Sequence, residues 1–147
     1  MKGNFMDMDL VSIIRGHRSK SKFRKASSEE ITLTEKSVPR YSEFPDLLFD
    51  EILIEFKLQR VEILVLIYIY RKIWNPNNAY SKYGIGPMLS HQDLSKVLKI
   101  DLDELQKAIR KLESLGLIET IRVGQYFIRK YFTEKNDINF NQNYDDF

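Results

Sequence analysis

Residues 90–132 read SHQDLSKVLKIDLDELQKAIRKLESLGLIETIRVGQYFIRKYF, and this stretch decides the fold. Ser90, followed by Asp93 three residues later, is close to a capping box, which marks the start of a helix. Asp101 and Glu104 give a second start signal only a few residues further on. Because one long helix would need only one such signal, the spacing predicts two short helices joined by a sharp turn.

Each of the two helices is expected to bury one face. In the first, which ends near Lys99, the apolar residues are Leu94, Val97 and Leu98, and Ile100 fits the buried position of the turn. The second is expected over residues 102–115. Its buried stripe is Leu102, Leu105, Ile109 and Leu112, and its opposite face carries Asp103, Lys107, Arg110, Lys111 and Ser114.

The end of the second helix leads into a predicted hairpin. Gly116 fits the left-handed cap that closes many helices. Residues 117–122 then alternate like a strand, residues 123–125 form a compact turn, and residues 126–132 are the expected return strand.

Two further helices are expected upstream. In residues 46–57, apolar side chains recur at spacings of three and four, which indicates an amphipathic helix; they are Leu48, Phe49, Ile52, Leu53 and Phe56. Residues 60–74 favour a strand on propensity alone. We prefer a helix, because the run lacks a turn signal and is long for a strand, and a helix apolar all round belongs at the buried centre. Residues 75–89 are predicted to be a long loop, with 85–89 as a short strand beside the hairpin.

The length of 147 residues suits one domain with tails, mainly α with a small β-hairpin. We expect a basic, mostly disordered arm over 1–42, a domain over 43–132, and a disordered acidic, Asn-rich tail over 133–147. From Leu10 to Ser28 the arm has no acidic residue, and its cations are Arg15, Arg18, Lys20, Lys22, Arg24 and Lys25. Such an arm commonly binds phosphate backbones; the alternative is a solvated tail that only aids solubility.

Nothing in the sequence predicts an enzyme, so we expect no catalytic residue, metal or cofactor. The absence of cysteine excludes disulfides and thiolate zinc sites, and it fits a reducing cytoplasm. His17 and His91 have no partner at metal-ligand spacing, and neither hydrolase nor nucleotide-binding motifs occur. No signal peptide is visible, and the apolar run 61–70 is too short to span a bilayer. The expected location is cytoplasmic, without a membrane partner.

Residues 44–132 resemble a winged helix-turn-helix domain. They are similar to the amino-terminal domains of phage and plasmid replication proteins and to MarR-like regulators. Those families share a Leu-Glu-x-x-Gly-Leu-Ile ending to the recognition helix, present here as residues 112–118. The resemblance implies that residues 102–115 would enter the major groove of DNA. It also implies that residues 118–132 would form a wing that contacts the backbone or the minor groove.

The leading hypothesis is therefore a duplex DNA-binding protein that acts in transcription regulation or replication initiation. The expected contacts in the domain are Lys96, Lys99, Lys107, Arg110, Lys111, Ser114, Arg122, Arg129 and Lys130, and the cations of the arm would add sequence-independent affinity. Two features depart from the family pattern. The recognition helix starts with the carboxylates of Asp101, Asp103 and Glu104, and the short wing has no basic tip beyond Arg122.

A second hypothesis is a non-enzymatic protein-interaction module built on the same fold. In that case the acidic helix 46–57, the acidic start of the second helix or the tails would face a protein partner. Homodimerisation is also open, because DNA-binding proteins of this size commonly pair to match a palindrome. The candidate contact surfaces for a dimer are the helix 46–57 and the loop 75–89.

Overall fold

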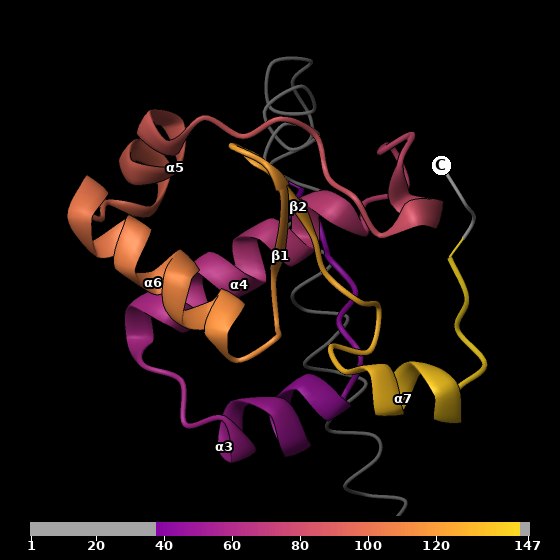
Figure 1. The fold of residues 1–147 in the computed structure, drawn as a ribbon. Coiled ribbons are helices and arrows are strands. Elements are labelled where there is room, and N and C mark those ends of the chain that lie inside the picture. Colours follow the sequence, from indigo (N-terminus) through magenta and orange to yellow (C-terminus); the bar gives the residue numbers. More distant parts are fainter. Residues whose placement is uncertain (1–37, 145–147) are drawn as a thin grey trace, which may run out of the picture. The chain divides into compact units, whose positions relative to one another are not determined.

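The structure is a computed structural model that describes residues 38–144. The chain divides into two units, Met1–Tyr41 and Ser42–Phe147, and all elements named below belong to the second. In chain order they are η1 (Leu48–Ile52), α3 (Leu53–Glu55), α4 (Arg60–Ile73), η2 (Ser81–Tyr83), α5 (His91–Leu98), α6 (Leu102–Ser114), β1 (Glu119–Arg122), β2 (Gln125–Phe127) and α7 (Glu134–Asn139). The described part is mainly helical with one small antiparallel hairpin, which confirms the expected α+β class (Figure 1).

Helix α4 is the buried centre of the second unit, so the prediction of a helix over residues 60–74 is confirmed. It begins at a capping box in which the Gln59 amide donates to Oε1 of Glu62 at 3.2 Å. Its fully buried side chains are Val65, Leu66, Ile69 and Ile73. The helix packs against α6 and runs behind α6 and the hairpin in Figure 1. Burial on several sides outweighs the β-propensity of the individual residues.

The predicted pair of short helices is confirmed as α5 and α6. The Ser90 hydroxyl caps α5 by accepting from the Asp93 amide at 3.3 Å. Lys99 ends α5 in the left-handed conformation at φ 54°, and Ile100 is buried in the turn that follows. Asp101 is the N-cap of α6, but its side chain makes no capping hydrogen bond. Gly116 follows α6 at φ +76°, as expected for its cap.

Some predicted core positions are wrong. Val97 is 57% exposed and Leu102 is 43% exposed. The buried residues of α6 are instead Leu105, Ala108, Ile109 and Leu112. The first turn of α6 lies outside the core, so Leu102 is exposed. Phe49 is exposed because residues 48–52 wind as a π-helical turn, whose wider repeat changes which side chains share a face.

The hairpin is shorter than predicted, because strand pairing ends earlier. Glu119 pairs with Phe127 and Arg122 with Gln125, with an irregularity between Thr120 and Arg122. Residues 128–132, expected to continue the return strand, lie outside β2. The Ile128 amide still donates to the Gly84 carbonyl at 3.1 Å, and the indole of Trp74 donates to the Ile128 carbonyl at 3.2 Å. The expected strand 85–89 is present as a single bridge, Ile85 to Phe127.

The disordered tail expected from residue 133 is contradicted up to residue 144, because this segment folds. Thr133 caps α7 by accepting from the Asn136 amide at 3.1 Å, and Asp137 is only 2% exposed. The polar composition of the segment concealed this order. Residues 145–147 lie outside the described part of the chain.

A buried carboxylate holds α7 and the chain that follows it. Oδ2 of Asp137 forms an ion pair with Arg129 at 3.2 Å and accepts from the Tyr144 hydroxyl at 2.6 Å. Oδ1 accepts from the Tyr131 amide at 3.2 Å. These three donors compensate the carboxylate for the loss of water.

We predict that Asp137→Ala lowers the free energy of unfolding by about 3 kcal/mol, because two donors and a half-buried guanidinium lose their acceptor. Urea denaturation measures the change. Asp103→Ala, at an exposed site on α6, is the matched control and should change stability by less than about 0.5 kcal/mol. Equal losses in both variants would contradict the structural role of Asp137.

We also predict that the protein loses stability in alkali. Burial raises the pKa of Tyr70, and burial together with the hydrogen bond to Asp137 raises the pKa of Tyr144. A tyrosine whose pKa is raised by folding contributes fully to the free energy of unfolding below the pKa of the unfolded chain, about 10. This contribution is lost as the pH rises from there toward the pKa of the folded protein. Urea denaturation from about pH 8 to 11 should show the loss. Tyr144→Phe should flatten the slope, whereas Tyr41→Phe, at an exposed site, should not.

Candidate nucleic-acid interface

The exposed face of α6 carries four of the predicted DNA contacts. Lys107, Arg110, Lys111 and Ser114 are all exposed. The positions 107, 110 and 114 follow one another at helical spacing, so they share one side of α6. The Ser114 hydroxyl donates to the Lys111 carbonyl at 2.6 Å, which makes Ser114 the weakest candidate of the four.

The three cations of α6 are free of ion pairs with the described residues. Asp103 and Glu104 are exposed on the first turn of the same helix, yet neither pairs with Lys107 or Lys111. Unpaired cations can meet phosphates without first giving up a carboxylate partner. The same two carboxylates repel phosphate at the start of α6, so the middle of the helix is its most favourable part for DNA.

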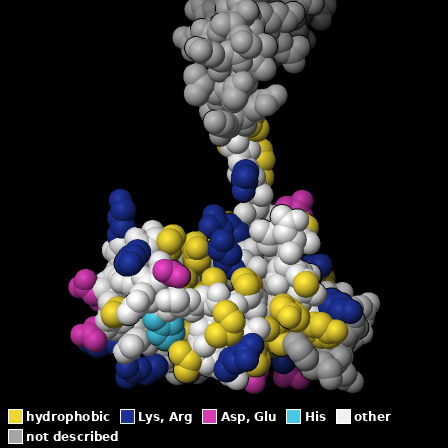
Figure 2. All heavy atoms as spheres, turned by 90° about the horizontal axis from the view of Figure 1, so that it is seen from above, with side chains coloured by type: hydrophobic (Ala, Val, Ile, Leu, Met, Phe, Trp, Pro, Cys, Tyr) yellow, Lys and Arg dark blue, Asp and Glu magenta, His cyan; other side chains and the backbone are white. Residues whose placement is uncertain are grey.

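Two further cations lie on or beside α5. Lys96 is exposed in its last turn, and Lys99 is exposed at the turn that leads to α6. Since α5 packs against α6, the structure brings these lysines to the same helical pair as Lys107. The face seen in Figure 2 carries lysine and arginine side chains scattered among acidic and apolar ones, without one continuous basic area.

A groove of about 210 Å³ separates α6 from the hairpin. Arg110 lines it together with Gln106, which sequence reasoning missed although it precedes Arg110 by one helical turn. His91, which has no partner at metal-ligand spacing in the sequence, also lines it and makes a 2.6 Å hydrogen bond with the Tyr126 hydroxyl. Burial raises the pKa of Tyr126. Through its hydrogen bond to Tyr126, His91 links α5 to β2.

The hairpin tip combines one cation with apolar side chains. Nε of Arg122 donates to Oε1 of Gln125 at 2.9 Å, so the exposed Arg122 is oriented by the neighbouring strand. Val123 at the turn is 78% exposed. The Leu89 amide donates to the Gly124 carbonyl at 2.6 Å, which ties the tip to the segment before α5.

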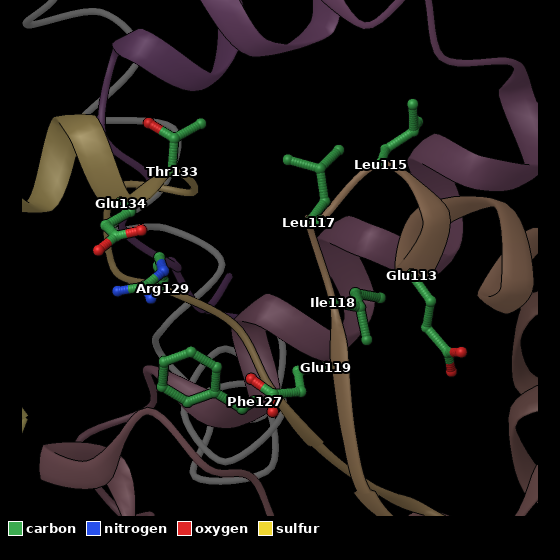
Figure 3. A pocket seen from close by; sticks show the side chains of 10 residues that line it. Glu113, Leu115, Leu117, Ile118, Glu119, Phe127, Arg129, Thr133 and Glu134 are labelled. Atoms are coloured by element: carbon green, nitrogen blue, oxygen red, sulfur yellow. The ribbon is translucent and has the colours of Figure 1, made fainter.

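The structure does not bring Arg129 together with the other predicted contacts. Its guanidinium is engaged by Asp137, and it lines a cavity of about 440 Å³. Three carboxylates line the same cavity: Glu113, Glu119 and Glu134. Figure 3 shows that the lining side chains come from the end of α6, the two strands, the start of α7 and the segments that connect them. These acidic surroundings disfavour a phosphate.

Lys130 also lies apart from α6. Its ammonium is 5.9 Å from the ring centre of Trp74 and 5.9 Å from that of Tyr131. The arm cations, Arg15, Arg18, Lys20, Lys22, Arg24 and Lys25, lie outside the described residues. The structure therefore groups Lys96, Lys99, Lys107, Arg110 and Lys111 on the α5–α6 pair, with Arg122 on the hairpin.

No protein-family model, curated protein or solved structure matches this chain. Between residues 38 and 144, no cluster of histidine, aspartate and glutamate has a geometry that could hold a metal ion. None of the helices described there has the length and apolar character needed to cross a membrane.

Two glycines next to the candidate interface should respond differently to substitution. A Cβ on Gly116 would meet no atom within 4 Å, so Gly116→Ala should cost only the left-handed strain, about 1 kcal/mol. A Cβ on Gly124 would lie 2.7 Å from the Leu89 carbonyl oxygen. We therefore expect Gly124→Ala to lower the free energy of unfolding by about 2 to 3 kcal/mol. Thermal or urea denaturation of both variants checks this, and an equal cost would contradict the close approach of Leu89.

Proposed function

We propose that this chain is a non-enzymatic DNA-binding protein of the cytoplasm, acting in transcription regulation or replication initiation through a winged helix-turn-helix domain. The observation that carries the proposal is the set of exposed cations Lys107, Arg110 and Lys111 on the second helix of the α5–α6 pair, which form no ion pair with any residue from 38 to 144. The element order supports it as well: α4, the Ile85 bridge, α5, α6 and the hairpin follow one another as that domain requires.

In the proposed complex the middle of α6 enters the major groove. Arg110 suits guanine, and Gln106 beside it suits adenine, because each side chain can form paired hydrogen bonds with that base edge. Lys96 and Lys99 would bind the phosphates that flank the groove. Arg122 would bind the backbone from the hairpin, and the basic arm would add contacts that carry no sequence information.

The first test is fluorescence anisotropy of a labelled mixed-sequence duplex titrated with the full chain at several salt concentrations. We expect Lys107→Gln/Arg110→Gln to weaken binding. A mixed-sequence duplex presents no fixed guanine to Arg110, so both cations would act there through phosphates, and the log–log salt slope should fall by up to about 2 units, about 0.9 for each contact.

The matched control removes the same charge elsewhere. Lys57→Gln/Lys135→Gln changes two exposed lysines outside α5, α6 and the hairpin. This control should retain the slope of the unchanged protein. Equal slopes in the two double variants would rule out α6 as the contact surface, and no binding at low salt would overturn the DNA proposal.

One observation favours the interaction module as a second candidate function. Phe49 and Ile54 are large apolar side chains exposed on the acidic helical segment η1–α3. Asp50, Glu51 and Glu55 lie on the same segment. A basic, partly apolar protein surface would complement it. Phe49→Ser should then abolish capture of a protein partner that persists after nuclease treatment, while leaving duplex binding unchanged.

A further inference from the structure

An aromatic cavity lies beside the C-terminal half of α4. Its volume is about 340 Å³, within the usual range for small-molecule sites. Four of its lining residues are aromatic: Phe44, Tyr70, Trp74 and Tyr131. The charged side chains that line it are Glu43 and Lys130, and none of the lining residues belongs to α5, α6 or the hairpin. This cavity is therefore a separate feature from the candidate DNA interface.

The rings around the cavity support one another. The rings of Phe44 and Tyr70 stack with their centres 5.5 Å apart, and Tyr70 stacks on its other neighbour, Phe132, at 4.7 Å. Trp74 is tilted against Tyr70 at 6.3 Å. Tyr70 is covered on both faces and only 2% exposed, so it fixes its neighbours and does not itself meet a ligand. The ring surfaces left for a planar ligand are those of the partly exposed Phe44, Trp74 and Tyr131, which the packing holds in place.

The polar atoms of the wall are already occupied. The Tyr70 hydroxyl donates to the Lys130 carbonyl at 2.7 Å, and the Trp74 indole donates to the Ile128 carbonyl at 3.2 Å. Two charged groups remain for a ligand: the ammonium of Lys130 and the carboxylate of Glu43. Both side chains are exposed, and neither forms an ion pair with the described residues.

The position of Lys130 selects the charge of the ligand. Its ammonium already lies 5.9 Å from the ring centres of Trp74 and Tyr131, where a cationic ligand would otherwise sit. A second cation there would be repelled, whereas an anionic group would be attracted. Glu43 adds an acceptor that suits the amino group of a nucleobase, as carboxylates accept from cytosine N4.

We propose that this cavity binds a nucleotide, with its base stacked on the aromatic wall and its phosphate at Lys130. Aromatic side chains that stack bases next to a cation are the usual means of binding unpaired nucleotides. The nucleotide is either free or part of a single strand, and both sources offer the same base and phosphate. This site does not depend on duplex binding by α6.

Trp74 makes the proposal directly measurable. It is the only tryptophan of the chain, so its fluorescence reports on this cavity alone. The full chain would be titrated with dCMP, deoxycytidine, inorganic phosphate and an eight-residue oligodeoxycytidine, with excitation at the red edge of the indole band. We expect saturable quenching by dCMP. Deoxycytidine should bind about threefold to fivefold more weakly, because one exposed charge pair is lost.

Matched variants identify the phosphate partner. Lys130→Gln should weaken dCMP binding by the same threefold to fivefold factor, and Lys135→Gln, at an exposed lysine of α7, should not. The Lys107→Gln/Arg110→Gln variant should bind dCMP as tightly as the unchanged protein. The proposal of duplex binding by α6 and the proposal of a nucleotide site can therefore be refuted separately. Tighter binding of the oligonucleotide than of dCMP would assign the site to single strands, and the reverse order would assign it to free nucleotides.

Three results would overturn the nucleotide site. They are an absence of saturable quenching by both dCMP and the oligonucleotide, equal effects of Lys130→Gln and Lys135→Gln, and equal quenching by inorganic phosphate and dCMP. Saturation-transfer NMR on the base protons of dCMP gives a second readout that does not depend on indole fluorescence.

Discussion

The burial of α4 is the constraint on which the rest of the second unit depends. Its apolar side chains occupy several sides of the helix, so one neighbour cannot cover them. The α5–α6 pair covers one part, with Leu105 and Leu112 fully buried. The segments around Leu48, Ile128 and Phe132 complete the same core. The orientation of α6, and therefore of its exposed cations, follows from the side of α4 that it must cover.

The charges at the surface separate two kinds of basic residue. Arg129 and Lys130 are adjacent in sequence to the hairpin, yet one serves a buried carboxylate and the other lies beside aromatic rings. Lys107, Arg110 and Lys111 have no such partners among residues 38–144. A position close to the predicted wing in the sequence therefore does not show that a cation is available to bind phosphate.

Local signals in the sequence predicted most of the helical framework. The cap at Ser90, the turn at Ile100, the left-handed Gly116 and the long apolar run of α4 all act through neighbouring residues, and all are present in the structure. The exposed face of α6 followed from the same helical periodicity. The winged-helix resemblance and the DNA-binding role remain predictions.

The features that the sequence did not reveal depend on distant partners. The order of α7 rests on Asp137 meeting Arg129, Tyr131 and Tyr144, a combination that no local pattern encodes. The return strand ends at Phe127, and beyond it the carbonyls of Ile128 and Lys130 accept from the side chains of Trp74 and Tyr70. Gln106 lines a groove whose opposite wall is the hairpin, a neighbour distant from it in sequence.

The hairpin also leaves the two edges of its small sheet in different states. The outer edge of β2 is covered by the chain at Ile85, where Gly86 donates to the Tyr126 carbonyl at 3.1 Å. In the described sheet β1 pairs only with β2, so its other edge is open. An open edge invites strand addition by a second chain. Here the strand is short, charged at Glu119 and Arg122, and irregular in between, three features that discourage edge-to-edge aggregation.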